Sequence, residues 1–409
     1  MRDETTVAMA PRAQLSNPRA PRRGVPFPLL GALLAAALGC AAAEGTTAAD
    51  APLLGFDAPT TDGRVAMANL EAALRAITPR LDASNARDGL RRRALDQHLL
   101  RHQVLAHPAD LAAADALAST FEGPGRAAAE AAVQDARHEW DAALAALPDA
   151  SREAESIALA RGADPGPIID ARRARVERAP AFATWLALAA ALNAAGRYDD
   201  ADLAYREALA AYGGISPFPV AFVQFARGVM WAERAGRPER ARPLYEEAVR
   251  RSPLYTVAQV HLAELEAEAG ELAAAIARLE DARAASPDPE APGLLGELVA
   301  DDARAAALVA EARASYDALL RTHRLAYADH ATEFFLGPGA DAARALRLAE
   351  ENLANRDTER ARDLAIRAAR AAGDGARACT LAAPYTRGER PVRTAPLAHT
   401  LRLSGCAPW

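Results

Sequence analysis

One spacing of glycine, alanine and large apolar residues occurs three times in this chain. Gly196, Gly236 and Gly270 each begin a copy, in which an alanine, a large apolar residue and a second alanine follow five, nine and twelve positions later. Gly236 and Gly270 are 34 residues apart, whereas Gly196 and Gly236 are 40 apart, which indicates a six-residue insertion around 213–219. A fixed period of this length is typical of stacked helical hairpins that bury apolar surface against their neighbours.

Composition and patterning agree with this interpretation. Half of the 409 residues are hydrophobic, but only 5% are aromatic, and alanine is abundant. Alanine is the best helix former and suits close packing of helices. No stretch alternates with the two-residue period of a strand. We therefore predict an all-α fold, an α-solenoid of antiparallel helix hairpins in which each unit packs on its neighbours in sequence, so that the molecule curves and has no single compact centre.

Residues 182–213 carry large and small residues at positions where two antiparallel helices would pack closely. These residues are Trp185, Leu188, Gly196, Tyr198, Ala201, Tyr205, Ala208 and Leu209. The pattern closely resembles the tetratricopeptide repeat, and it returns in 220–253 and in 256–287. The resemblance covers about a quarter of the chain and implies a superhelical array that binds other proteins.

The rest of the chain divides around this array, which we place at 179–287. Periodic apolar stripes interrupted by Pro and Gly predict divergent helical hairpins over 64–178 and again over 288–386. Residues 387–409 show little periodicity, and we predict an irregular tail there. Residues 41–63 are rich in Ala, Thr, Gly and Asp, which favours a flexible linker.

The first 40 residues predict export. Residues 29–39 form a short apolar run behind Arg19, Arg22 and Arg23, which fits a secretory signal better than a membrane span. The run ends at Cys40 in a sequence that resembles the bacterial lipobox, although Leu38 lies nearer the cysteine than the family pattern prefers. The resemblance implies lipidation of Cys40 and a location in the cell envelope or periplasm. The alternative is a cytoplasmic adaptor whose apolar segment is not cleaved.

The charged residues exclude several functions. The formal net charge is −6, which disfavours nucleic-acid binding. All 48 basic residues are arginine, so a phosphate-loop lysine and Schiff-base chemistry are excluded. No nucleophile motif or glycine-rich phosphate loop is present. We predict that the protein is not an enzyme and uses no cofactor.

Two histidines and two cysteines are candidate site residues. His98 and His102 lie four positions apart, a helical spacing that metal sites use, but no third ligand is evident. Two exposed histidines beside several arginines are the simpler interpretation, so no metal site is predicted, and an envelope enzyme or metal-dependent factor using this region remains the alternative. Cys379 and Cys406 are 27 residues apart and would form a disulfide in an oxidising compartment.

The predicted functional surface is the concave face of the array. In tetratricopeptide repeats the first helix of each hairpin lines this face, which implies a groove of half apolar and half acidic character. Its residues would be Leu186, Ala190, Asn193, Val223, Met230, Glu233, Arg234, Val257, Val260, Glu264 and Glu268. Such a groove favours a protein partner with apolar and basic side chains. Alternatively, the chain's own helices fill it. We predict a scaffold or adaptor that recruits other proteins at the cell envelope.

Overall fold

The computed structural model describes residues 59–81, 88–148 and 151–406, and within them every regular element is helical. The predicted signal sequence, Cys40 and most of the predicted linker lie outside these residues. No helix among the described residues is both long and apolar enough to cross a lipid bilayer. The prediction of an all-α fold is confirmed.

Within its described residues, the N-terminal region forms seven helices. They are α1 (Gly63–Leu81), α2 (Asp88–Leu105), α3 (Pro108–Ala118), α4 (Gly123–Ala136), α5 (Trp140–Ala146), α6 (Arg152–Ala160) and α7 (Pro165–Arg178). Proline stands at the first turn of α3 and α7, where its missing N–H does not weaken the helix.

The repeated segments form three consecutive hairpins. They are α8 (Phe182–Ala194) with α9 (Tyr198–Ala210), α10 (Pro217–Val229) with α11 (Pro238–Arg251), and α12 (Thr256–Glu268) with α13 (Leu272–Ala285). A single π-helical turn, η2 (Met230–Arg234), extends α10. The inserted residues lie in the loop between α9 and α10 and in the first turn of α10.

The backbone explains two uses of glycine in the repeated sequence. Gly196, Gly236 and Gly270 all have positive φ, between 67° and 81°, at the turn between the two helices of a hairpin. Other residues rarely adopt this conformation, so the glycines set the repeat. Gly228 instead allows α10 and α11 to approach closely, because a Cβ atom there would lie 2.3 Å from the buried Tyr245 ring.

Seven further helices follow in the described part of the chain. They are α14 (Glu290–Leu298), α15 (Asp302–Thr322), α16 (Arg324–Leu336), α17 (Ala342–Asn355), α18 (Glu359–Ala371), α19 (Gly375–Thr386) and α20 (Ala395–Leu403). The prediction of an irregular tail over 387–409 is wrong at α20, whose Leu397 is fully buried against the core of α15–α19. Cys379 and Cys406 form a disulfide, with Cα atoms 5.3 Å apart, which joins α19 to the segment after α20.

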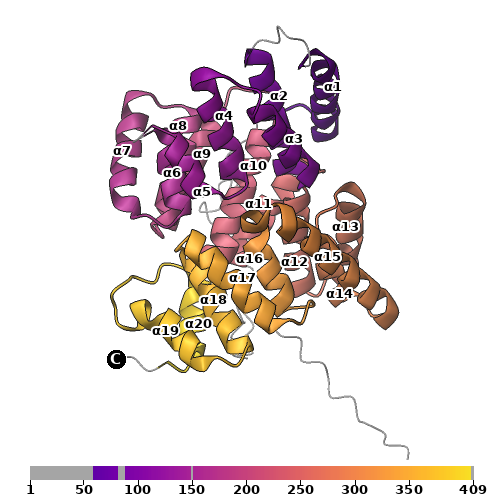
Figure 1. The fold of residues 1–409 in the computed structure, drawn as a ribbon, viewed down its shortest axis with the longest axis vertical. Coiled ribbons are helices and arrows are strands. Elements are labelled where there is room, and N and C mark those ends of the chain that lie inside the picture. Colours follow the sequence, from indigo (N-terminus) through magenta and orange to yellow (C-terminus); the bar gives the residue numbers. More distant parts are fainter. Residues whose placement is uncertain (1–58, 82–87, 149–150, 407–409) are drawn as a thin grey trace, which may run out of the picture.

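Helices pack in consecutive pairs, but the first and last described helices also contact the central repeats (Figure 1). The Ser286 hydroxyl donates to the Leu105 carbonyl at 2.6 Å, and the Asn355 amide donates to the His138 carbonyl at 2.9 Å. The Tyr198 hydroxyl also reaches the backbone after α19, at a distance of 2.7 Å from its acceptor. The expectation that each hairpin contacts only its sequence neighbours is therefore incomplete. The array curls until segments between 181 and 217 residues apart touch.

Candidate functional site

The predicted groove residues do not all face solvent. Val223 and Met230 are fully buried in the core of α8–α12, and Val260 is buried between α12, α13 and α14. The groove assignment is therefore wrong for these three residues. They lie on the helix stripes that pack against neighbouring helices, so a partner cannot reach them.

The other eight predicted groove residues keep some exposure. Ala190 and Glu268 are exposed, whereas Leu186, Asn193, Glu233, Arg234, Val257 and Glu264 are half-buried. Leu186 and Val257 pack at the edges of apolar clusters. The polar members Glu233, Glu264 and Glu268 belong to a larger group of charged side chains on the inner side of the curl.

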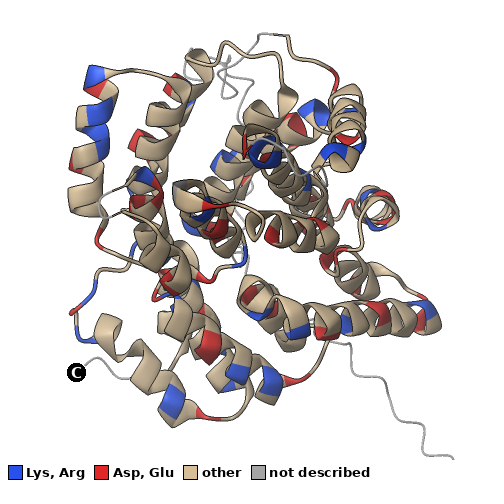
Figure 2. Cartoon of the chain, turned by 45° about the horizontal axis from the view of Figure 1, so that its top comes forward, with Lys and Arg blue, Asp and Glu red and all other residues tan. Residues whose placement is uncertain are grey.

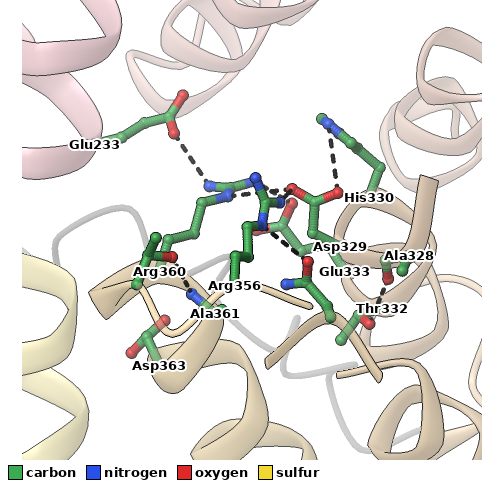
Figure 3. Close-up of polar contacts among 12 residues, drawn as sticks. Glu233, Ala328, Asp329, His330, Thr332, Glu333, Arg356, Arg360, Ala361 and Asp363 are labelled. Carbon is green, nitrogen blue, oxygen red and sulfur yellow. Dashed lines mark hydrogen bonds and ion pairs between the residues drawn. The ribbon is translucent and has the colours of Figure 1, made fainter. Parts of the chain in front are cut away.

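Arg360 on α18 is the centre of this inner charged cluster. Its guanidinium lies 3.1 Å from Glu233 on η2 and 2.8 Å from Glu333 on α16, and 3.7 Å from Asp329 (Figure 3). Arg356, just after α17, forms a second ion pair with Asp329. The middle repeat is thereby joined to helices more than 90 residues later in the chain. The chain's own helices therefore fill part of the predicted groove, which was the alternative to a groove open to a partner.

The inner charged cluster nevertheless stays in contact with solvent. The Arg360 side chain is 37% exposed, whereas Asp329 beside it is nearly buried. Burial disfavours the charged form of Asp329, but Arg356, His330 and Arg360 outweigh this effect and lower its pKa. Asp329 is therefore a carboxylate held charged by its neighbours.

Two histidines connect further carboxylates to the cluster. His261 on α12 lies 3.2 Å from both Glu233 and Glu264. Burial favours its neutral ring, but the two carboxylates outweigh it and raise the pKa of His261 to about 9. His330 on α16 pairs with Glu290 on α14; against the effect of burial, Asp329 and Glu290 raise the pKa of His330 to about 10. Both rings are cationic at neutral pH.

Alkaline pH should weaken the fold through these two histidines. Their folded-state pKa values exceed the ordinary value near 6.5, so their contribution is complete below that pH and is lost as pH rises through about 9 and 10. We expect the free energy of unfolding to fall by about 2 kcal/mol between pH 7 and pH 10, allowing for solvent screening. Urea titrations at both pH values measure it. Replacing His261 and His330 with Gln should remove most of the drop, whereas His399→Gln on α20 should not; an unchanged drop in the double variant contradicts this assignment.

One edge of the inner face carries carboxylates without cationic partners. Glu268 on α12 and Glu297 on α14 are exposed, and neither forms an ion pair with any described residue. Desolvation and the nearby Glu264 carboxylate raise the pKa of each to about 7. We call Glu264, Glu268 and Glu297 the acidic edge. At neutral pH Glu268 and Glu297 are therefore only partly ionised, and a nearby cation would favour their charged form. Of the three carboxylates, Glu264 has a cationic partner, His261.

The histidine pair near the N-terminus is part of a structural contact. His98 Nδ1 lies 2.7 Å from buried Asp110 on α3, which Arg101 also binds at 2.7 Å, and His102 Nδ1 lies 3.0 Å from the His107 carbonyl oxygen. Both rings are half-buried, so the expectation of exposed histidines is wrong. Among the described residues, no group of three or more His, Cys, Asp or Glu residues could hold a metal ion.

A buried ion pair inside the first two repeats was not predicted. Arg227 is completely buried, and its Nε donates to Asp202 at 2.9 Å; the Trp231 indole N–H donates to the same carboxylate oxygen at 3.1 Å. The signal available in the sequence was a charged residue beside the small packing residues Ala201 and Gly228. Because Asp202 and Arg227 lie far apart in sequence, no local pattern indicated that they pair.

Comparison with known proteins locates the repeats. The family model of the tetratricopeptide repeat matches residues 232–298, from η2 to the end of α14. The similarity to the tetratricopeptide repeat is therefore shown for this segment. The first predicted repeat, 182–213, precedes the matched segment, although α8 and α9 form the same kind of hairpin. No curated protein sequence matches the chain.

Several solved structures are similar in shape. A chain of the APC/C hetero-tetramer Cut9–Hcn1 has a TM-score of 0.41 at 14% identity, over 79% of this chain and 64% of its own length. Yeast Tom70 has a TM-score of 0.34 at 10% identity, with 84% of this chain and 93% of Tom70 covered. The P58(IPK) TPR domain has a TM-score of 0.25 at 15% identity, with 84% and 95% covered. The present chain thus spans under two thirds of the Cut9–Hcn1 chain.

Proposed function

We propose that this protein is a non-enzymatic scaffold that binds a basic segment of a partner protein at the acidic edge. The observation that carries the proposal is the lack of cations at Glu268 and Glu297. Both carboxylates are exposed, form no ion pair with a described residue and lie close enough to Glu264 for its charge to raise their pKa. A partner's arginine or lysine would supply the missing positive charge.

The surroundings of the acidic edge suit a segment of mixed character. Leu272, four residues after Glu268 in sequence, is 47% exposed at the start of α13. An exposed leucine near unpaired carboxylates favours a partner that offers apolar as well as basic side chains. The repeats hold α12 and α14 rigidly through their shared apolar core, so the edge is pre-formed.

The proposed binding is tested by Glu→Gln substitutions, which remove the charge of a side chain and keep its shape. Proteins captured by cross-linking in intact cells are identified, purified and titrated against the wild type and the Glu268→Gln/Glu297→Gln variant. We expect the double variant to weaken binding by about tenfold or more, since charge-assisted bonds contribute roughly 1.5–3 kcal/mol. Added salt should weaken wild-type binding as well.

Glu153→Gln on α6 serves as the matched control, because Glu153 is an exposed carboxylate far along the chain from the acidic edge. The Glu153→Gln variant should bind the captured proteins with the affinity of the wild type. Equal affinity of the double variant and the wild type for every captured protein would overturn the acidic edge as a docking site. The double variant should fold normally, because it removes unpaired charges from an exposed surface.

We also propose that the chain is exported and anchored through Cys40. The apolar run at 29–39 supports export, and the Cys379–Cys406 disulfide supports an oxidising compartment, where such bonds persist. Mass spectrometry of the mature protein should find an acylated N-terminal cysteine in the wild type and none after Cys40→Ser. A full-length, unacylated wild-type chain would favour the cytoplasmic alternative.

A further inference from the structure

An arginine-lined cavity lies between α6, α7 and α8, away from the inner charged cluster. It has a volume of about 130 Å³, and three of its lining residues are Arg152, Arg172 and Arg175. Ser156, Thr184 and two alanines of α8 complete the lining. Basic residues gather along α7 (Figure 2), in a chain whose formal net charge is −6.

The walls of this cavity are fixed before any ligand enters. The Arg172 side chain is 2% exposed, and its guanidinium donates to the Ala187 carbonyl at 2.6 Å and to the Ser156 hydroxyl at 2.9 Å. Arg175 makes a two-pronged contact with Glu155, at 2.6 and 2.5 Å. Guanidinium groups held in this way need little reorganisation to bind an anion.

The charge balance of the cavity is positive. Glu155 is the carboxylate that pairs with Arg172 and Arg175, and Arg152 forms no ion pair with any described residue. Three guanidiniums therefore face one carboxylate. Burial lowers the pKa of Arg172 despite the proximity of Glu155, so the pair does not fully offset the loss of solvent.

We propose that this cavity binds a phosphate group. A phosphate group carries a charge of about −1.5 to −2 at neutral pH, which is closer to the two uncompensated positive charges than the single charge of a carboxylate. Arginine also suits phosphate because its planar fork donates two parallel hydrogen bonds. Arg152 at the exposed end and Arg172 at the buried end would contact the anion together. The phosphate can be free or part of a small monoester.

Calorimetric titration of the full chain with inorganic phosphate, at constant ionic strength, tests the proposal. We expect saturable binding, and Arg152→Ala should weaken it by about tenfold, the loss of one charge-assisted contact. Arg152 is exposed, so this variant should fold. Arg173→Ala is the matched control, because Arg173 is an exposed residue on α7 that does not line the cavity; its phosphate affinity should stay that of the wild type.

Further titrants distinguish a phosphate monoester from the free ion and test whether the cavity prefers phosphate to another anion. Glycerol phosphate that binds as well as inorganic phosphate indicates a monoester ligand, and weaker binding indicates the free ion; both outcomes support the site. Acetate that binds as tightly as phosphate would overturn the assignment to phosphate. No binding, or equal affinity in wild type and Arg152→Ala, would overturn the site itself.

Discussion

Replacing Asp202 with alanine is expected to lower the free energy of unfolding by about 3–5 kcal/mol, because it leaves a fully buried guanidinium without its carboxylate. Arg227 is completely buried, and burial already lowers its pKa although Asp202 opposes that effect. The Trp231 indole N–H would also lose its acceptor. Urea-induced unfolding monitored by circular dichroism measures the change.

Two variants show whether the ion pair is the cause. Adding Arg227→Met to Asp202→Ala removes the stranded charge, so it should recover a large part of the lost stability. Asp200→Ala, two residues away, removes an exposed carboxylate that pairs with Arg197 at the surface, and its effect should stay below about 1 kcal/mol. An Asp202→Ala protein as stable as the Asp200→Ala protein would contradict the argument.

Loss of the Cys379–Cys406 disulfide should destabilise the C-terminal helices by about 3–4 kcal/mol in the chain-entropy model, given the sequence separation of 27 between the two cysteines. The bond closes a loop that contains α20, whose Leu397 packs in the same core as α16–α19. We expect Cys379→Ser/Cys406→Ser to lower the melting temperature or to produce an earlier transition from this region.

A reducing agent gives the same test without mutation. In a Cys40→Ser background it should reproduce the effect of the double serine replacement, and it should have no effect on that double variant. The contact of Tyr198 with the Arg393 carbonyl links this region to the first repeat. Tyr198→Phe therefore serves as a milder probe. Identical melting of oxidised and reduced protein would show that the bond does not contribute to stability.

The spacing of Gly196, Gly236 and Gly270 was enough to predict the central hairpins. Each glycine occupies a turn with positive φ, which depends on a few neighbouring residues only. Ala201 and Ala208 are fully buried, as the predicted close packing of the two helices requires. The prediction of an irregular tail over 387–409 was wrong because α20 is short. Its stability comes from the burial of Leu397 and from a disulfide rather than from its own periodicity.

The inner face was only partly predictable. Glu233 and Glu264 both contact His261, and Glu233 also pairs with Arg360, whereas Val223 and Met230 point into the core. The prediction failed for these two residues because a family pattern carried over by position cannot fix the rotation of each helix. Arg360, which organises the inner charged cluster, lies 127 residues from Glu233. No local rule pairs two side chains at that separation.

The sequence by itself determined the all-helical class, the hairpin length and the order of the repeats, since these follow from interactions within about 34 residues. The tertiary structure decided how far the array curls, which carboxylates meet an arginine and which remain unpaired at Glu268 and Glu297. Those outcomes depend on long side chains from distant helices meeting in space. Their partners are selected by geometry and desolvation rather than by spacing along the chain.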